Sequence, residues 1–108
     1  MKRLAFIGSS RADLKQFPRE ARKEAGYQLD QVQQGRDPKD WKPMTSIGPG
    51  VREIRIQEIS GAFRVIYVAT FAEAVFVLHA FQKKTQRTPM RDLALATTRF
   101  KDLRRRIT

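Results

Sequence analysis

The chain has 108 residues, a length that predicts a single domain spanning residues 1–108, and 41% of its residues are apolar, enough to form a core. It carries 22 Lys and Arg against 11 Asp and Glu, and the net charge of +11 favours nucleic acid as partner over an acidic protein or an anionic membrane. The chain has no Cys, one His and no transmembrane run, which excludes disulfides and thiolate metal sites and predicts a cytoplasmic protein without metal or cofactor.

The first third predicts a strand followed by a helical hairpin. Leu4–Ile7 is an apolar run that is too short for the core of a signal peptide. We interpret it as the first strand. Ser9 or Ser10 can cap a short helix over Arg11–Phe17, and Pro18 fits the first turn of a second helix that ends near Gly35. The second helix has small and apolar residues at helical spacing: Ala21, Ala25, Leu29 and Val32.

Residues 36–50 are predicted to be irregular. Three Pro-containing turns interrupt them, at Asp37-Pro38, Lys42-Pro43 and Gly48-Pro49-Gly50. A loop of this length is often functional or packed under its own side chains. Trp41 has two interpretations here: it pins the loop to the body of the protein, or it stacks on a nucleobase.

Residues 51–68 predict a β-hairpin. Val51–Ile59 and Ala62–Val68 are the two predicted strands, with arginines set into them, and Ser60-Gly61 between them suits a two-residue turn. One face of this hairpin is predicted to join the core, and it carries Ile54, Ile56, Phe63, Val65 and Tyr67.

The opposite face of the hairpin is half basic and half apolar, because it carries Ile66 and Val68 beside two arginines. The two-residue turn places Arg55 opposite Ile66 and Gln57 opposite Arg64, so the two arginines become diagonal neighbours. Arginine suits phosphate, because its fork donates two parallel hydrogen bonds and stays charged. The alternative interpretation is that both are ordinary solvated residues on an exposed sheet face.

The next strand, Ala74–Phe81, is apolar on both faces and is therefore predicted to be central. Its alternation places Val75, Val77 and Phe81 on one face and Phe76, Leu78 and Ala80 on the other. Successive side chains point to opposite sides, so only one of Lys83 and Lys84 should reach a cleft, and the pattern does not choose between them. His79 either packs in the strand or acts as an acid or base.

Thr88-Pro89 begins the last predicted helix, whose apolar stripe is Leu93, Ala96, Phe100, Leu103 and Ile107. The predicted fold is therefore α+β in the order β-α-α-β-β-β-α, a small mostly antiparallel sheet with an N-terminal helical hairpin and a C-terminal helix. No catalytic triad, metal-ligand spacing or phosphate loop is present. RNA still permits cleavage, because its own 2′-OH can attack the adjacent phosphate while the protein orients and stabilises the reaction.

Three segments carry a family resemblance: Val51–Ile56, Gly61–Tyr67 and above all Leu78–Pro89, with its His-Ala-Phe-Gln-Lys-Lys-Thr-Gln-Arg-Thr-Pro run. They resemble the RelE/ParE toxin superfamily, most closely the phage-derived, HigB-like branch of type II toxin–antitoxin systems. The resemblance implies a RelE-like fold and a metal-independent endoribonuclease that cleaves mRNA on the ribosome. It implies as partners a helix-turn-helix antitoxin, mRNA and ribosomal RNA.

The resemblance also implies catalytic roles for Arg55, Arg64 and Lys83 or Lys84. The C-terminal tyrosine that acts as base in RelE is absent, since the last helix has Phe100, and His79 becomes the candidate acid or base. Candidate RNA contacts are Arg52, Gln57, Gln82, Lys84, Thr85 and Arg87. Two rivals stay open: a ParE-like toxin that inhibits DNA gyrase, and a basic nucleic-acid-binding module without enzymatic activity.

Overall fold

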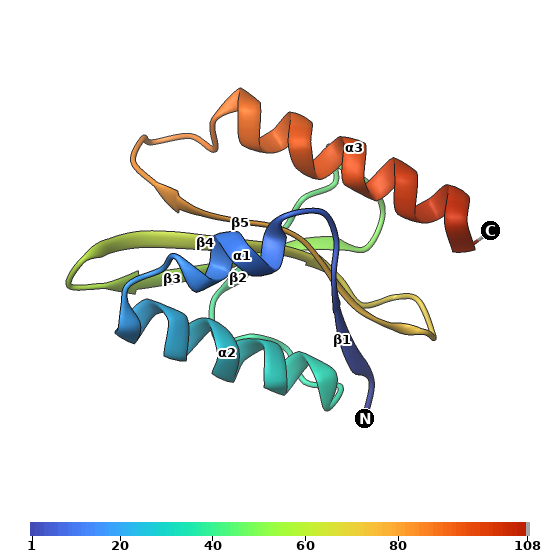
Figure 1. Cartoon of the computed structure of the whole chain (residues 1–108), viewed down its shortest axis with the longest axis horizontal. Helices are drawn as coiled ribbons and strands as arrows, with labels where there is room; N and C mark the ends of the chain where they lie inside the picture. The colour runs from blue at the N-terminus through green and yellow to red at the C-terminus, as the bar shows by residue number, and fades with distance from the viewer. Residues whose placement is uncertain (108) are drawn as a thin grey trace.

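The computed structural model describes residues 1–107, so Thr108, the last residue of the predicted domain, lies outside the described residues. A five-stranded sheet lies between α3 on one face and α1 and α2 on the other (Figure 1). The elements in chain order are β1 (Arg3–Phe6), α1 (Ser10–Lys15), α2 (Arg19–Gln33), β2 (Trp41–Pro43), β3 (Val51–Glu58), β4 (Gly61–Val68), β5 (Ala74–Lys83) and α3 (Met90–Ile107).

The strand order in the sheet is β1-β5-β4-β3-β2. Within residues 1–107, only the pairing of β1 with β5 is parallel, and the other three pairings are antiparallel. This arrangement confirms the predicted α+β class, with its helical hairpin, three consecutive antiparallel strands and last helix. No helix within residues 1–107 is both long and apolar enough to cross a membrane.

β2 is the one strand that the sequence did not predict. Its three residues pair antiparallel with Arg52–Ile54 of β3, inside the stretch expected to be irregular. A strand of three residues is too short to show an alternating pattern, and Pro43 is tolerated because β2 is at the edge of the sheet. Trp41 therefore lies in a strand that extends the sheet.

Each face of the sheet has its own core. On one face, α1 and α2 pack on the apolar side of the hairpin, which is buried as predicted. On the other, α3 and residues 44–47 cover β4 and β5 through Ala96, Phe100 and Leu103. Gly48 lies directly under the Phe100 ring, where an added Cβ would be 2.1 Å from a ring carbon. The second core therefore requires glycine at this position.

The predicted register of the hairpin is wrong. Ile59 and Ser60 form the turn, Glu58 pairs with Gly61, and Arg55 lies directly opposite Arg64. Gly61 is the first residue of β4 rather than part of the turn, and its φ of 135° is accessible chiefly to glycine. Each pairing has moved by two residues, an even number, so every side chain keeps its predicted face.

A bulge in β5 overturns part of the predicted alternation. Ile66 pairs with His79 and the next residue, Tyr67, pairs with Val77, which leaves Leu78 as an extra residue. Beyond this point Ala80 packs in the α1/α2 core and Phe81 in the α3 core, the reverse of their predicted faces. The bulge also presents His79 to α3.

Candidate functional site

A basic pocket of about 650 Å³ opens beside the hairpin, on the sheet face that α3 partly covers. Its residues come from β3, β4, the end of β5 and the segment that follows: Arg55, Gln57, Ala62, Arg64, Lys83, Lys84, Thr85 and Gln86. Two neighbouring cross-strand rows supply most of it, Arg55 opposite Arg64 and Gln57 opposite Ala62, with Lys83 beyond Ala62. We call these eight residues the basic pocket.

Arg64 lies in the deepest part of the basic pocket. Its side chain is only 8% exposed, its Nε is 3.6 Å from Glu53 Oε1, and one terminal nitrogen donates to the Phe63 carbonyl at 3.0 Å. Burial lowers the pKa of Arg64, and the Glu53 carboxylate opposes this effect. Arg64 Nε has no hydrogen-bond partner among the described residues, so one donor of the guanidinium is unsatisfied. The negative charge of Glu53 nevertheless stabilises the buried positive charge.

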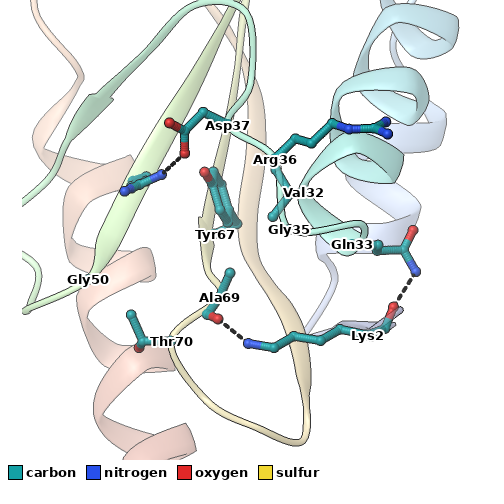
Figure 2. A pocket seen from close by; sticks show the side chains of 11 residues that line it. Lys2, Val32, Gln33, Gly35, Arg36, Asp37, Gly50, Tyr67, Ala69 and Thr70 are labelled. Atoms are coloured by element: carbon teal, nitrogen blue, oxygen red, sulfur yellow. Dashed lines mark hydrogen bonds and ion pairs between the residues drawn. The ribbon is translucent and has the colours of Figure 1, made fainter.

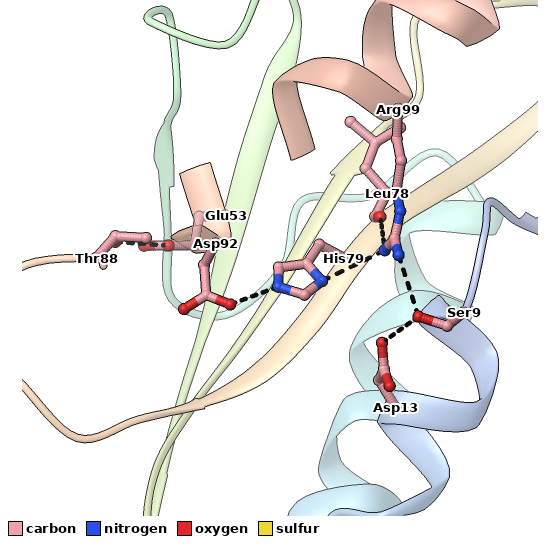
Figure 3. Close-up of polar contacts among 8 residues, drawn as sticks. All are labelled: Ser9, Asp13, Glu53, Leu78, His79, Thr88, Asp92 and Arg99. Carbon is pink, nitrogen blue, oxygen red and sulfur yellow. Dashed lines mark hydrogen bonds and ion pairs between the residues drawn. The ribbon is translucent and has the colours of Figure 1, made fainter. Parts of the chain in front are cut away.

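Glu53 is a buried carboxylate that the sequence analysis did not single out. Its side chain is fully buried, and it lies 3.9 Å from Lys42 Nζ as well as 3.6 Å from Arg64. It also accepts a hydrogen bond from Thr88 Oγ1 at 3.2 Å (Figure 3). Glu53 and Arg55 are two residues apart on β3 and share a face, so the face of Glu53 was predictable, but its burial involves Thr88, in the segment before α3.

Arg55 and the two lysines form the accessible part of the basic pocket. The Arg55 side chain is 45% exposed, and its contact with Asp40 is long, at 4.0 Å. Partial burial lowers the pKa of Lys83, and the positive charge of Arg64 lowers it further. Lys84 lines the pocket too, contrary to the prediction that only one lysine would, because β5 ends at Lys83 and the alternation ends with it.

The structure does not bring His79 to the basic pocket. Its ring is buried under α3, with Nε2 2.6 Å from Asp92 Oδ1 and Nδ1 3.4 Å from Arg99 Nη1 (Figure 3). Arg99 donates further to the Leu78 carbonyl at 2.9 Å and to Ser9 Oγ at 3.0 Å. His79 therefore belongs to a network that joins β5, α3 and the start of α1.

Arg52 lies on the opposite face of the sheet from the basic pocket. It pairs across the hairpin with Tyr67, contacts Asp37 at 2.9 Å and lies 3.9 Å above the Trp41 ring. Arg52, Asp37 and Tyr67 border a separate cavity of about 280 Å³, which Figure 2 shows between Lys2 and Asp37. Tyr67 is buried as predicted, and burial raises its pKa.

Three of the remaining predicted contacts lie in the basic pocket and two lie outside it. Gln57, Lys84 and Thr85 line the basic pocket with Arg55, Arg64 and Lys83. Gln82 instead donates to the Ser60 carbonyl at 3.3 Å, and Arg87 lines a neighbouring cavity. Within residues 1–107, no three or more His, Cys, Asp or Glu side chains are grouped to hold a metal ion.

The architecture and the basic pocket define a class: a small α+β protein with a RelE-like sheet, in which basic side chains cluster at one end of a sheet face. Comparison with protein families matches residues 12–101 to the family described as "Phage derived protein Gp49-like (DUF891)". The chain belongs to this phage-derived family, which is associated with RelE-like toxins. Comparison with curated proteins finds no match.

Proposed function

We propose that this protein is the toxin of a type II toxin–antitoxin system, of the HigB-like branch, and a metal-independent endoribonuclease that cleaves mRNA on the ribosome. The observation that carries the proposal is the convergence of Arg55, Arg64 and Lys83 from three adjacent strands on one pocket. Membership of a family associated with RelE-like toxins supports it.

The pocket suits a phosphate that is attacked by its own ribose. In the proposed step the 2′-oxygen bonds to phosphorus, the bond to the 5′-oxygen breaks, and a 2′,3′-cyclic phosphate remains. Arg55, at the exposed side of the pocket, binds the non-bridging oxygens of the phosphate. The buried charge of Arg64, at the inner side of the pocket, stabilises the negative charge that develops in the transition state. Both residues act more strongly in the transition state, where the phosphate carries more charge.

Lys83 is the proposed proton donor to the leaving 5′-oxygen. Its pKa is lowered by partial burial and by Arg64, which brings an ammonium closer to the range useful for acid catalysis. None of the residues lining the basic pocket is a carboxylate or an imidazole, so in this scheme the 2′-OH proton passes to water. Catalysis then depends chiefly on orientation and charge.

The proposal is tested by incubating purified protein with translating ribosomes and a defined message, and then mapping the 3′ ends. We expect cuts that leave cyclic phosphates, and a loss of about 100-fold or more in Arg55→Ala. Arg55 is preferred to Arg64 because it is exposed, so its loss should leave the fold intact. Arg11→Ala, which removes an exposed charge from α1, is the matched control.

Intact message with the wild-type protein would refute the ribonuclease. If the protein instead blocked DNA supercoiling by gyrase, the ParE-like alternative would replace it. A salt-sensitive complex with RNA but no turnover would leave only a nucleic-acid-binding module.

The proposed partner is a helix-turn-helix antitoxin encoded beside this chain. Growth arrest on expression, reversed by the neighbouring protein, is the expected result. Arg55→Ala should remove the arrest but keep binding to the neighbour if the two interactions use different surfaces, which a pull-down measures. Arrest that the neighbour does not reverse would contradict the pairing.

A further inference from the structure

A second cavity, of about 950 Å³, adjoins the basic pocket. It lies between residues 42–46, at and after β2, and residues 85–93, which lead into and begin α3. Lys83, Thr85 and Gln86 line both cavities, so a single ligand can reach from one to the other. We call the second cavity the apolar groove; its volume lies near the upper end of the usual range for ligand pockets, about 300–1,000 Å³.

The apolar groove has the chemistry of a nucleobase site. Met44, Met90 and Leu93 provide a broad apolar wall, and the thioether of methionine packs well on flat rings. Met90 is 82% exposed, an apolar side chain that the cores do not use. Short hydroxyl groups line the groove as well, at Thr45 and Ser46, and can hydrogen-bond to the edge of a base.

The surroundings of the groove suit a nucleic-acid strand. Lys42, Lys83 and Arg87 line it together with the apolar residues, in positions where they can contact phosphates on either side of a bound base. Thr88, also in the lining, is hydrogen-bonded to Glu53, the carboxylate beside Arg64. One wall of the groove is therefore tied to the residue that holds the arginine of the basic pocket.

We propose that the apolar groove binds one unpaired nucleobase of single-stranded RNA, next to the phosphate bound in the basic pocket. The inference rests on the proposed function, because it requires a phosphate in the basic pocket. A base in a duplex is stacked on both sides and cannot enter, so the groove selects single strands and contributes the base preference of cleavage. The continuity through Lys83 favours this occupant over an apolar protein segment.

The test uses a fluorescent 2′-O-methyl RNA heptamer, which cannot self-cleave, and a set of heptamers with one base removed at each position. Anisotropy gives the affinity of each for the wild-type protein and for Met90→Ala. We expect one abasic position to weaken wild-type binding about tenfold, the effect of removing one well-packed base. Met90→Ala should weaken the intact heptamer, and at that one position the abasic RNA should bind both proteins about equally.

Ile59→Ala is the matched control, because Ile59 is a fully exposed apolar residue at the hairpin turn and does not line the groove. Its effect should add to that of every abasic position. Additive losses at all positions in Met90→Ala as well would overturn the base subsite. Cleavage by wild type without this coupling would leave the ribonuclease standing and the subsite refuted. Coupling without cleavage would retain the subsite and refute the ribonuclease.

Discussion

Glu53 is the residue on which the charge balance of the basic pocket depends. A fully buried carboxylate and a nearly buried guanidinium, 3.6 Å apart, are costly to desolvate, and each compensates the other. Removal of one partner leaves the other as an uncompensated buried charge. Glu53 therefore stabilises the buried Arg64 and also weakens the attraction between Arg64 and a bound phosphate.

Glu53→Gln keeps the side-chain shape and removes the charge. We expect the free energy of unfolding, measured by urea denaturation, to fall by about 3–5 kcal/mol, the cost of breaking a buried ion pair. Lys42→Ala breaks the longer, half-exposed contact with the same carboxylate and should cost about 1 kcal/mol or less. Equal stabilities for the two variants would show that the Arg64 contact does not stabilise the fold.

Lys83 should make RNA binding sensitive to pH. Partial burial, then the charge of Arg64, place the pKa of Lys83 below the ordinary value of 10.5, so it loses its positive charge at a lower pH than an ordinary lysine. Affinity for a non-cleavable RNA should therefore fall as the pH rises through that lowered pKa. Lys83→Arg stays charged to above about pH 12 and should remove this part of the decline. Parallel pH curves for the two proteins would contradict the assignment.

At the scale of elements, alternation predicted some strands well and others poorly. β3 and β4 have one apolar and one mixed face, so period two placed Arg55 and Arg64 together even though the turn was misplaced. β5 is apolar on both faces, so the extra residue at Leu78 left no trace in the sequence. The sequence also could not reveal that Glu53 is buried, because the covering segment is far along the chain.

The helix α3 is held at its first turn by a buried polar contact. His79, turned toward α3 by the β5 bulge, lies 2.6 Å from Asp92, and the His79 ring stacks on Phe81 with centroids 5.2 Å apart. The same first turn borders the apolar groove through Met90 and Leu93. His79 lies apart from the residues of the basic pocket, and we expect it to position α3.

His79→Asn separates this positioning role from acid catalysis. We expect unfolding to become easier by about 1–3 kcal/mol, because Asp92 loses its buried partner, and amide exchange in the first turn of α3 to accelerate. Cleavage per folded molecule should fall less than about tenfold, whereas loss of a general acid costs about 100-fold or more. A fall of that larger size, with α3 still protected from exchange, would make His79 catalytic.

At the scale of the whole molecule, the question is whether the charge of +11 acts as a diffuse field or through the basic pocket. Exposed cations lie on the helices as well as at the pocket, for example Lys23 on α2. A diffuse field would attract any polyanion and would weaken about equally with the loss of any one charge. If RNA instead binds at the basic pocket, each phosphate contact there contributes separately to the salt dependence of binding.

The salt dependence of RNA binding distinguishes the two. Each phosphate contact on a single strand contributes about −0.7 to the slope of log K against log salt concentration. Lys84 is exposed and lines the basic pocket, so Lys84→Ala should make the slope shallower by about 0.7, while Lys23→Ala should leave it unchanged. Titrations of a non-cleavable single strand at several salt concentrations give both slopes. Equal changes in the two variants would mean that the net charge, rather than the pocket, binds RNA.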